Sequence, residues 1–230
     1  MRTIGLIGGM SFESTLVYYR MINEMVRRAL GPSHSARIVM ESVDFADIIA
    51  CQKENRWDDA AEILAGSAKR LEQAGAKSML ICTNTMHLVA GQVGNAVGVP
   101  LIDIIDETAA AIRTSGMRRP LLLATRYTME HGFYADRMKK HGIDIMVPEA
   151  ADRTRVHNVI FEELCCGIID DSSRQALEAI IEKAKAAGAD SVILGCTEIC
   201  LILDPDRLAL PGFDSTAIHA SAAVRLALAA

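Results

Sequence analysis

Several features are scarce or missing in this chain of 230 residues, and each absence excludes a class of protein. No apolar run reaches the roughly 18 to 20 residues of a membrane-spanning helix, and the N-terminus MRTIGLIGGMS lacks the pattern of a secretory signal. Basic residues number 24 against 29 acidic ones and are scattered, which argues against a nucleic-acid groove. We therefore expect a cytoplasmic globular protein that binds neither nucleic acid nor membrane.

Motifs for cofactors and metals are missing as well. Gly5, Gly8 and Gly9 have the spacing G-x-x-G-G, which differs from the dinucleotide fingerprint G-x-G-x-x-G, and no P-loop is present. The cysteines lack the C-x-x-C spacing of zinc sites, and in a reducing compartment they should remain thiols. We expect no metal and no cofactor. The six cysteines are Cys51, Cys82, Cys165, Cys166, Cys196 and Cys200.

Short apolar runs of strand length alternate with helix-length segments along the chain. Two of these segments, 57–71 and 174–187, place apolar residues on one face at spacings of three and four, and Gly75 and Gly188 end them. The alternation predicts an α/β fold of mainly parallel sheets flanked by helices. The expected strands are 4–7, 37–43, 77–82, 99–102, 120–124, 143–147 and 191–194.

The chain also contains an internal repeat. AGAKSMLICTNTMHL at 74–88 aligns with AGADSVILGCTEICL at 187–201, which places Thr83 opposite Cys196. RTIGLIGGMSFE at 2–13 aligns with RPLLLATRYTME at 119–130 at nearly the same offset. Duplication predicts two pseudosymmetric α/β domains with a ligand cleft between them. The expected domains are 1–105 with 210–230, and 106–209.

Polar segments follow four of the expected strands, at 8–11, 82–85, 124–128 and 195–198. Ligands of parallel sheets bind beyond the carboxyl ends of the strands, so these segments form the candidate site. Each is expected to open a helix, where free N–H groups and hydroxyls favour a carboxylate or phosphate. Ordinary N-capping explains any single segment equally well, whereas four that converge favour a ligand.

The thiol of Cys196 stands at the end of the run VILG and before an expected helix. The positive end of a helix lowers a thiol pKa, so we predict a thiolate base, with an inert buried thiol as the alternative. Cys82 lies one residue earlier in its own turn. Because side chains alternate along a strand, we expect Cys82 to face the core.

Four motifs resemble the aspartate/glutamate racemase family over the whole chain: G-L-I-G-G-M-S-F-E-S-T-L-V-Y-Y at 5–19, C-T-N-T-M-H at 82–87, G-C-T-E at 195–198 and F-D-S-T-A-I-H-A at 213–220. The resemblance implies a cofactor-independent amino-acid racemase, usually a homodimer, with its active site between two α/β domains. In the usual member, a cysteine from each half flanks the substrate Cα. One removes a proton and the other delivers one to the opposite face.

This chain departs from that pattern in its first half. The resemblance assigns the second cysteine to Cys196, whereas the first falls on Thr83. A hydroxyl is about seven pKa units worse than a thiol as a base, so Thr83 can hydrogen-bond the substrate or relay a proton from water. The Thr/Cys arrangement resembles the subgroup of L-aspartate/glutamate-specific racemases, in which the remaining cysteine works on the L-face.

A second departure concerns substrate charge. Basic residues that hold substrate carboxylates in typical aspartate racemases fall on Gln52 and Cys165, both uncharged, which leaves Arg56 and Arg126 as candidates for the side-chain carboxylate. Solvated arginines are an equally economical interpretation. Glu198, Asp214 and His219 could orient Cys196 or the substrate, or serve as a helix-start carboxylate, a cap and a core histidine. The predicted substrate-binding residues are Met10, Ser11, Gln52, Arg56, Asn84, Thr85, Arg126, Cys165, Thr197 and Glu198; Cys196 and Thr83 are the predicted catalytic pair.

Two other functions stay open. The same plan serves isomerases and a decarboxylase of small dicarboxylates, and the decarboxylase also has one active-site cysteine in its second half. The T-N-T turn and the G-G-M-S loop favour racemisation. A catalytically impaired amino-acid-binding protein is the alternative from another class, because half of the usual pair of bases is missing.

Overall fold

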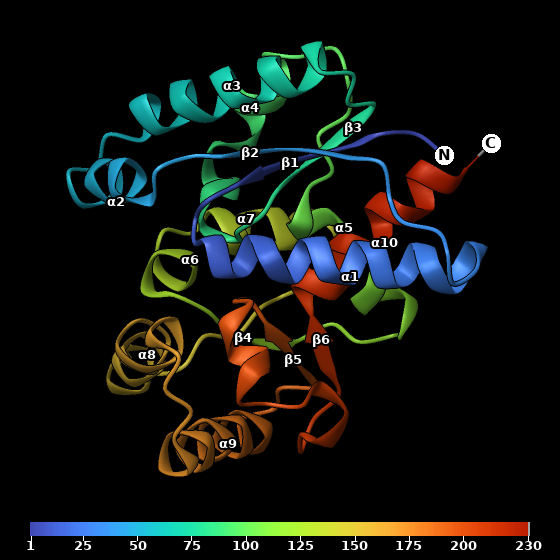
Figure 1. The fold of residues 1–230 in the computed structure, drawn as a ribbon. Coiled ribbons are helices and arrows are strands. Elements are labelled where there is room, and N and C mark those ends of the chain that lie inside the picture. Colours follow the sequence, from blue (N-terminus) through green and yellow to red (C-terminus); the bar gives the residue numbers. More distant parts are fainter. Residues whose placement is uncertain (230) are drawn as a thin grey trace. The chain divides into compact units, whose positions relative to one another are not determined.

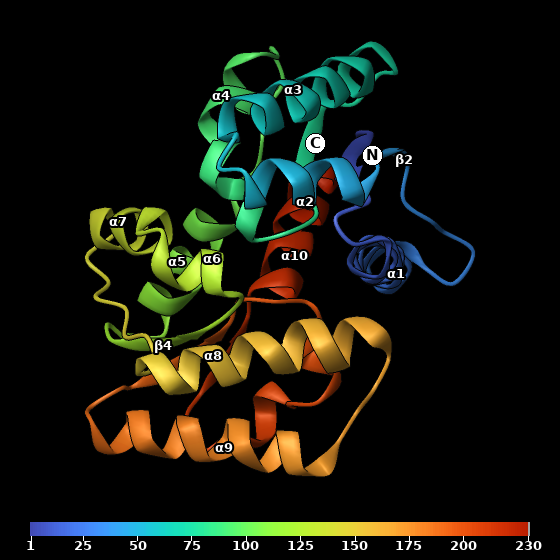
Figure 2. The same cartoon turned by 90° about the vertical axis from the view of Figure 1, so that its left-hand side faces the viewer.

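The computed structural model describes residues 1–229, which form two compact units (Figures 1 and 2). Unit 1 comprises Met1–Asp103 and the C-terminal segment from His219, and unit 2 comprises Ile104–Ile218. The described residues contain no helix that is long and apolar enough to cross a membrane. Residues 104–105 and 210–218, which the sequence groups with the first domain, lie in unit 2.

Unit 1 is built on a parallel sheet in the order β2-β1-β3, formed by β1 (Ile4–Gly8), β2 (Ile38–Ser42) and β3 (Ser78–Ile81). Alternate side chains of β1 enter two cores. Leu6 packs with residues of α1 and α10, while Ile7 packs with residues of α3. The helices are α1 (Phe12–Leu30), α2 (Phe45–Lys53), α3 (Trp57–Gln73), η1 (Thr85–Val89), α4 (Ala90–Asn95) and most of α10 (Ser215–Leu228).

Unit 2 contains a second parallel sheet, in the order β4-β5-β6, formed by β4 (Pro120–Leu123), β5 (Ser191–Leu194) and β6 (Gly212–Asp214). The strands β4 and β5 are buried along their whole length. Around them lie α5 (Ile104–Thr114), α6 (Arg126–Glu130), α7 (Phe133–Lys140), α8 (Ala150–Asn158), η2 (Val159–Glu163), η3 (Leu164–Cys166), α9 (Asp171–Ala186), η4 (Glu198–Leu201) and η5 (Pro205–Arg207).

The α/β prediction is confirmed, and two of the predicted strands are wrong. Segments 99–102 and 143–147 form only single bridges, Met79 with Leu101 and Leu121 with Met146. β6 was missed because its three residues, Gly-Phe-Asp, do not form an apolar run. The helices α3 and α9 lie where they were predicted, although α3 continues two residues further and α9 begins three residues earlier. They end before Gly75 and Gly188, which adopt φ of +96° and +93°.

The internal repeat is visible in the register of the two sheets. In unit 1, Ile7 pairs with Ile81, and in unit 2, Leu123 pairs with Leu194. The next N–H groups close the ladders in the same way, from Cys82 to Ile7 O at 2.9 Å and from Gly195 to Leu123 O at 2.8 Å. Thr83 and Cys196 therefore occupy equivalent positions, each the second residue beyond its strand.

His219 of α10 is completely buried in unit 1 as a neutral ring. One ring nitrogen lies 2.8 Å from the carbonyl oxygen of Ile102, and the other lies 2.8 Å from the hydroxyl of Tyr18. A carbonyl only accepts, so Nε2 carries the proton and Nδ1 accepts from Tyr18. Burial and the neighbouring His87 lower the pKa of His219 to about 3. Of the interpretations considered for this residue, the structure supports the core histidine.

This buried imidazole should make the fold sensitive to mild acid. The unfolded chain protonates His219 near pH 6.5 while the folded one does not, so its contribution to stability is complete above that pH and declines as pH falls toward 3. We expect this group to lower the free energy of unfolding by up to about 1.4 kcal/mol per pH unit. Urea unfolding at pH 7, 6, 5 and 4.5 measures it. The His219→Gln variant should show a flatter slope, and an unchanged slope would contradict the assignment.

Candidate active site

The first candidate loop follows β1 and is held rigidly. Gly9 adopts φ of +90°, and a side chain there would collide with the Val43 carbonyl. Its N–H donates to Thr15 Oγ1 at 2.9 Å. Ser11 caps α1 by accepting from the Ser14 N–H at 3.2 Å, and Met10 is buried. The backbone and the cap together fix Met10 and Ser11 at the carboxyl end of β1.

The second candidate loop follows β3 and turns Thr83 away from the core. Cys82 is fully buried, as predicted, and burial raises the pKa of its thiol. Thr83 is half-buried, and its N–H donates to Ile81 O at 2.9 Å. Its carbonyl accepts from His87 Nδ1 at 2.8 Å. Asn84 and Thr85 follow at the start of η1, both buried.

Gln52 lies in the last turn of α2, and Arg56 lies three residues beyond the end of that helix. The two side chains differ in how far they can serve a bound substrate. Gln52 Nε2 lies 3.3 Å from the sulfur of Met86 in η1, so this side chain reaches the Thr83 loop. The Arg56 guanidinium forms ion pairs with Glu54 and Asp59, which raise its pKa. A guanidinium already paired with two carboxylates has less attraction to offer a third.

In unit 2, the loop after β5 holds a compact group of thiol, hydroxyl and carboxylate. Cys196 Sγ donates to Glu198 Oε2 at 2.8 Å, and Thr197 Oγ1 donates to the same oxygen at 2.7 Å. Glu198 is only 7% exposed. Two donors to one oxygen compensate for part of the cost of burying this carboxylate.

The predicted low pKa of Cys196 is wrong. Burial raises its pKa well above the ordinary value, the charge of Glu198 and the hydrogen bond to it add to this, and the backbone N–H of Glu198 opposes them. A low pKa here would require a substantial helix dipole, but η4 is a 3₁₀-helix of four residues. A single turn contributes little dipole, and the carboxylate acts in the other direction.

Two further thiols lie beside this group. Cys165 sits on η3, which packs against η4; desolvation and the charge of Glu198 raise its pKa to about 12. Cys200 donates to the half-buried carboxylate of Asp214, and desolvation raises the pKa of Asp214. Asp214 also caps α10, accepting from the N–H groups of Thr216 at 2.9 Å and Ala217 at 3.1 Å. The cap interpretation of Asp214 is therefore confirmed.

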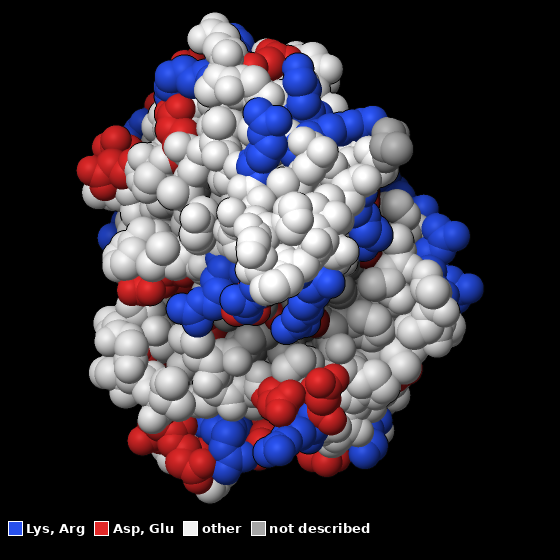
Figure 3. Space-filling view, turned by 45° about the vertical axis from the view of Figure 1, so that its right-hand side comes forward, with Lys and Arg blue, Asp and Glu red and all other residues white. Residues whose placement is uncertain are grey.

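Arg126 opens α6, which Thr125 caps. Its side chain forms no ion pair with any residue of 1–229, in contrast to Arg56. The Arg126 N–H donates to His157 Nδ1 at 3.4 Å, and burial together with the Arg126 charge lowers the pKa of His157. Sequence reasoning missed His157, which lies in the last turn of α8, two residues before the π-helix η2; such helices occur often at functional sites. On the face shown in Figure 3, basic and acidic side chains are interspersed.

Unit 1 thus holds seven of the predicted residues, and unit 2 holds five. In unit 2, hydrogen bonds connect Cys196, Thr197 and Glu198. In unit 1, Thr83, Asn84 and Thr85 are consecutive in the sequence. Arg56 is diverted into its own ion pairs. The unit 1 set is completed by Met10, Ser11, Gln52 and Arg56, and the unit 2 set by Arg126 and Cys165.

Known proteins resemble this chain throughout its length. A crystal structure of a Yersinia pestis protein ascribed to the Asp/Glu racemases is 49% identical, with a TM-score of 0.94 and full coverage of both chains. An aspartate racemase homologue from Pyrococcus horikoshii OT3 is 34% identical, with a TM-score of 0.88 and 99% coverage of both. The broad specificity amino-acid racemase RacX of Bacillus subtilis is 22% identical over 98% of both chains.

The family comparison agrees with the motifs and with the two sheets. The sequence model described as Asp/Glu/Hydantoin racemase matches residues 7–223, which is nearly the whole chain. That range includes both loops of the repeat, with Thr83 in one and Cys196 in the other. The chain therefore belongs to the Asp/Glu/hydantoin racemase family and is an amino-acid racemase, an isomerase.

Proposed function

We propose that this chain racemises L-aspartate and L-glutamate without a cofactor, with the Cys196 thiolate as the base that removes the Cα proton. The main support for this proposal is the group in unit 2, where Cys196 and Thr197 both donate hydrogen bonds to the carboxylate of Glu198. The equivalence of Thr83 and Cys196 in the two registers supports their assignment as the paired groups of the reaction. In this proposal, Thr83 serves the opposite face of the substrate through a water-derived proton.

The raised pKa of the Cys196 thiol is compatible with a base that loses its proton only when substrate binds. Burial and Glu198 raise the pKa of Cys196, so the thiol form is favoured. The ammonium group of a bound amino acid, placed against Glu198, adds the positive charge that favours the thiolate. Removal of the Cα proton then leaves a planar carbanion, and the α-carboxylate takes up part of the charge. The N–H groups and hydroxyls of the loop that opens η1 are suited to bind this carboxylate, because such donors stabilise a developing negative charge.

We assign the side-chain carboxylate of the substrate to Arg126 rather than Arg56. Arg126 forms no ion pair within residues 1–229, whereas Arg56 is paired with Glu54 and Asp59. Gln52 and Cys165 would then contribute hydrogen bonding and shape at the same end of the substrate. A guanidinium suits a carboxylate because it can donate two parallel hydrogen bonds.

The cellular setting and the assembly are part of the proposal. All six cysteines are free thiols, and Cys165 and Cys166 are exposed neighbours, which favours a reducing compartment such as the cytoplasm. The resemblance to the family favours a homodimer.

Deuterium uptake tests the reaction directly. In D₂O, the Cα proton signal of L-glutamate or L-aspartate should disappear in the ¹H NMR spectrum, and chiral chromatography should detect the D-enantiomer in parallel. Because the equilibrium constant is one, the product should approach equal amounts of both forms. Uptake of deuterium without D-product would restrict the chemistry to one face. No uptake with measurable binding would favour the impaired binding protein, and release of CO₂ from a substituted malonate would favour the decarboxylase.

A further inference from the structure

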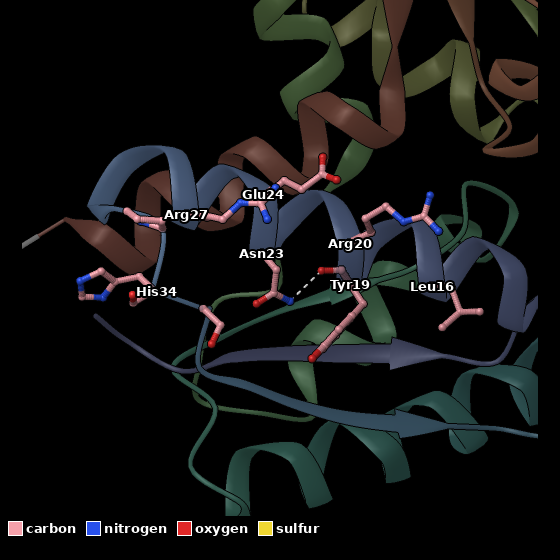
Figure 4. A pocket seen from close by; sticks show the side chains of 10 residues that line it. Leu16, Tyr19, Arg20, Asn23, Glu24, Arg27 and His34 are labelled. Atoms are coloured by element: carbon pink, nitrogen blue, oxygen red, sulfur yellow. Dashed lines mark hydrogen bonds between the residues drawn. The ribbon is translucent and has the colours of Figure 1, made fainter.

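The two sides of α1 differ in what they contact. Leu16, Tyr19 and Asn23 line a shallow hollow at the surface, where Asn23 Nδ2 donates to Tyr19 O at 2.8 Å (Figure 4). Ser14 and Tyr18, by contrast, are buried, and Tyr18 packs in the core beside the sheet. The buried side of α1 is therefore the one that can hold the loops of the candidate site.

Three hydrogen bonds fix the backbone on both sides of Thr83. Ser14 Oγ, in the first turn of α1, donates to the carbonyl oxygen of Cys82 at 2.8 Å, and this bond is buried. The Thr83 N–H donates to Ile81 O at 2.9 Å. The Thr83 carbonyl accepts from His87 Nδ1 at 2.8 Å. The peptide group before Thr83 and the one after it are therefore both held.

The ring of His87 is itself held by buried neighbours. His87 is buried, and its ring packs edge to face against that of His219, with the ring centroids 5.4 Å apart. His219 is fixed in turn by the Tyr18 hydroxyl and the Ile102 carbonyl, each at 2.8 Å. Because these neighbours are fixed and closely packed, the His87 ring has little room to turn, and its Nδ1–H stays directed at the Thr83 carbonyl.

The other half of the repeat is built differently at this place. The offset that aligns Thr83 with Cys196 places Cys200 opposite His87. The thiol of Cys200 donates to a carboxylate of β6, and the Cys196 carbonyl accepts from a backbone N–H of η4 at 3.3 Å. In unit 1 an imidazole thus binds the carbonyl beside the hydroxyl, whereas in unit 2 a backbone N–H binds the carbonyl beside the thiol.

We propose that His87 is a positioning residue for the opposite face of the substrate, because its hydrogen bond to the Thr83 carbonyl fixes the direction of the Thr83 side chain. The role rests on the proposed function, in which Cys196 removes the Cα proton. The Thr83 hydroxyl then gives its proton to the carbanion and regains one from water. Such a relay depends on placement, since a displacement of about 1 Å can lower the rate by about a hundredfold. Ser14 holds the same turn from α1.

The partition between two products in D₂O tests this role. After Cys196 has removed the proton from L-glutamate, the carbanion either returns as deuterated L-glutamate or becomes D-glutamate through Thr83. His87→Gln displaces the donor from the place of Nδ1, so it should lower the ratio of D-glutamate to deuterated L-glutamate by about tenfold or more, while KM changes by less than about twofold. Chiral chromatography with mass detection measures both products at early times.

Three further variants separate the hydrogen bond from a general effect on folding. In His87→Asn the amide nitrogen is bonded to Cγ, as Nδ1 is in histidine, so it can donate to the Thr83 carbonyl and should keep the ratio within about twofold. Ser14→Ala removes the bond to the preceding carbonyl and should lower the ratio as well. His34→Gln, the same exchange at an exposed histidine of unit 1, should leave the ratio unchanged. Damage to the fold as a whole would slow the formation of both products together.

Hydrogen exchange of the backbone, measured by mass spectrometry on peptides that cover residues 79–89, reports on the turn without substrate. Exchange should be faster in His87→Gln than in the wild type or in His87→Asn. If the wild type racemises but His87→Gln keeps its product ratio, or if His87→Asn behaves like His87→Gln, the role of His87 is wrong; Ser14→Ala decides in the same way if His87→Gln does not fold. A wild type without deuterium uptake or D-product would count against the proposed function, and the exchange rates would still show whether His87 holds the turn.

Discussion

Replacing Cys196 with serine should reduce Cα deuterium uptake from L-glutamate by at least about a thousandfold while the protein stays folded. The change preserves the shape of the side chain and its hydrogen bond to Glu198, but it removes the acidity of the thiol. A serine hydroxyl cannot supply a comparable base at neutral pH, even with a substrate ammonium nearby. The rate of deuterium uptake per enzyme molecule, measured by ¹H NMR in D₂O for the wild type and for the variant, gives this ratio.

Two controls test the assignment of the base to Cys196. Substrate binding, measured by calorimetry, should persist in Cys196→Ser, because the carboxylates are proposed to be held by N–H groups, hydroxyls and Arg126. Cys166→Ser removes an exposed thiol from the same unit, whose sulfur lies 3.7 Å from Phe161 O, and should retain activity. Substantial exchange in Cys196→Ser would place the base elsewhere.

Thr83→Cys should raise the turnover of D-aspartate and D-glutamate relative to the L-enantiomers by about tenfold or more. Thr83 occupies the register position of Cys196 in the other sheet, and a thiol there would give the second face a base of its own. The change should affect kcat more than KM, because it alters proton transfer rather than binding. Initial rates on all four substrates, for wild type and variant together, provide the comparison.

The increase in D-substrate turnover depends on where the new sulfur lies, because a displaced sulfur transfers the proton much more slowly. Thr114→Cys serves as the control: it adds a thiol on α5 at an exposed position and should leave the enantiomer ratio unchanged. If Thr83→Cys folds and still acts on L-substrates without a relative gain on D-substrates, then Thr83 does not stand where a second base would act.

Much of this protein could be predicted from local sequence pattern. Apolar periodicity and the glycines at 75 and 188 gave α3 and α9, because a helix face and its termination depend on residues only a few positions apart. The repeat predicted that Thr83 and Cys196 would be equivalent, and the alternation along β3 predicted the buried side chain of Cys82. The motifs identified the family from the residue types alone.

The tertiary structure decided everything that depends on segments distant in the chain. Segments 99–102 and 143–147 look like strands but form only single bridges, and Gly-Phe-Asp becomes β6 because it pairs with β5. His219 is neutral because burial and the neighbouring His87 lower its pKa to about 3. Its two ring nitrogens bind Ile102 and Tyr18, and Tyr18 lies on a helix two hundred residues away in the sequence. The Cys196 pKa rises because burial outweighs a one-turn helix. Desolvation and charge act through space, so they are set by which segments pack together, and local pattern does not contain that information.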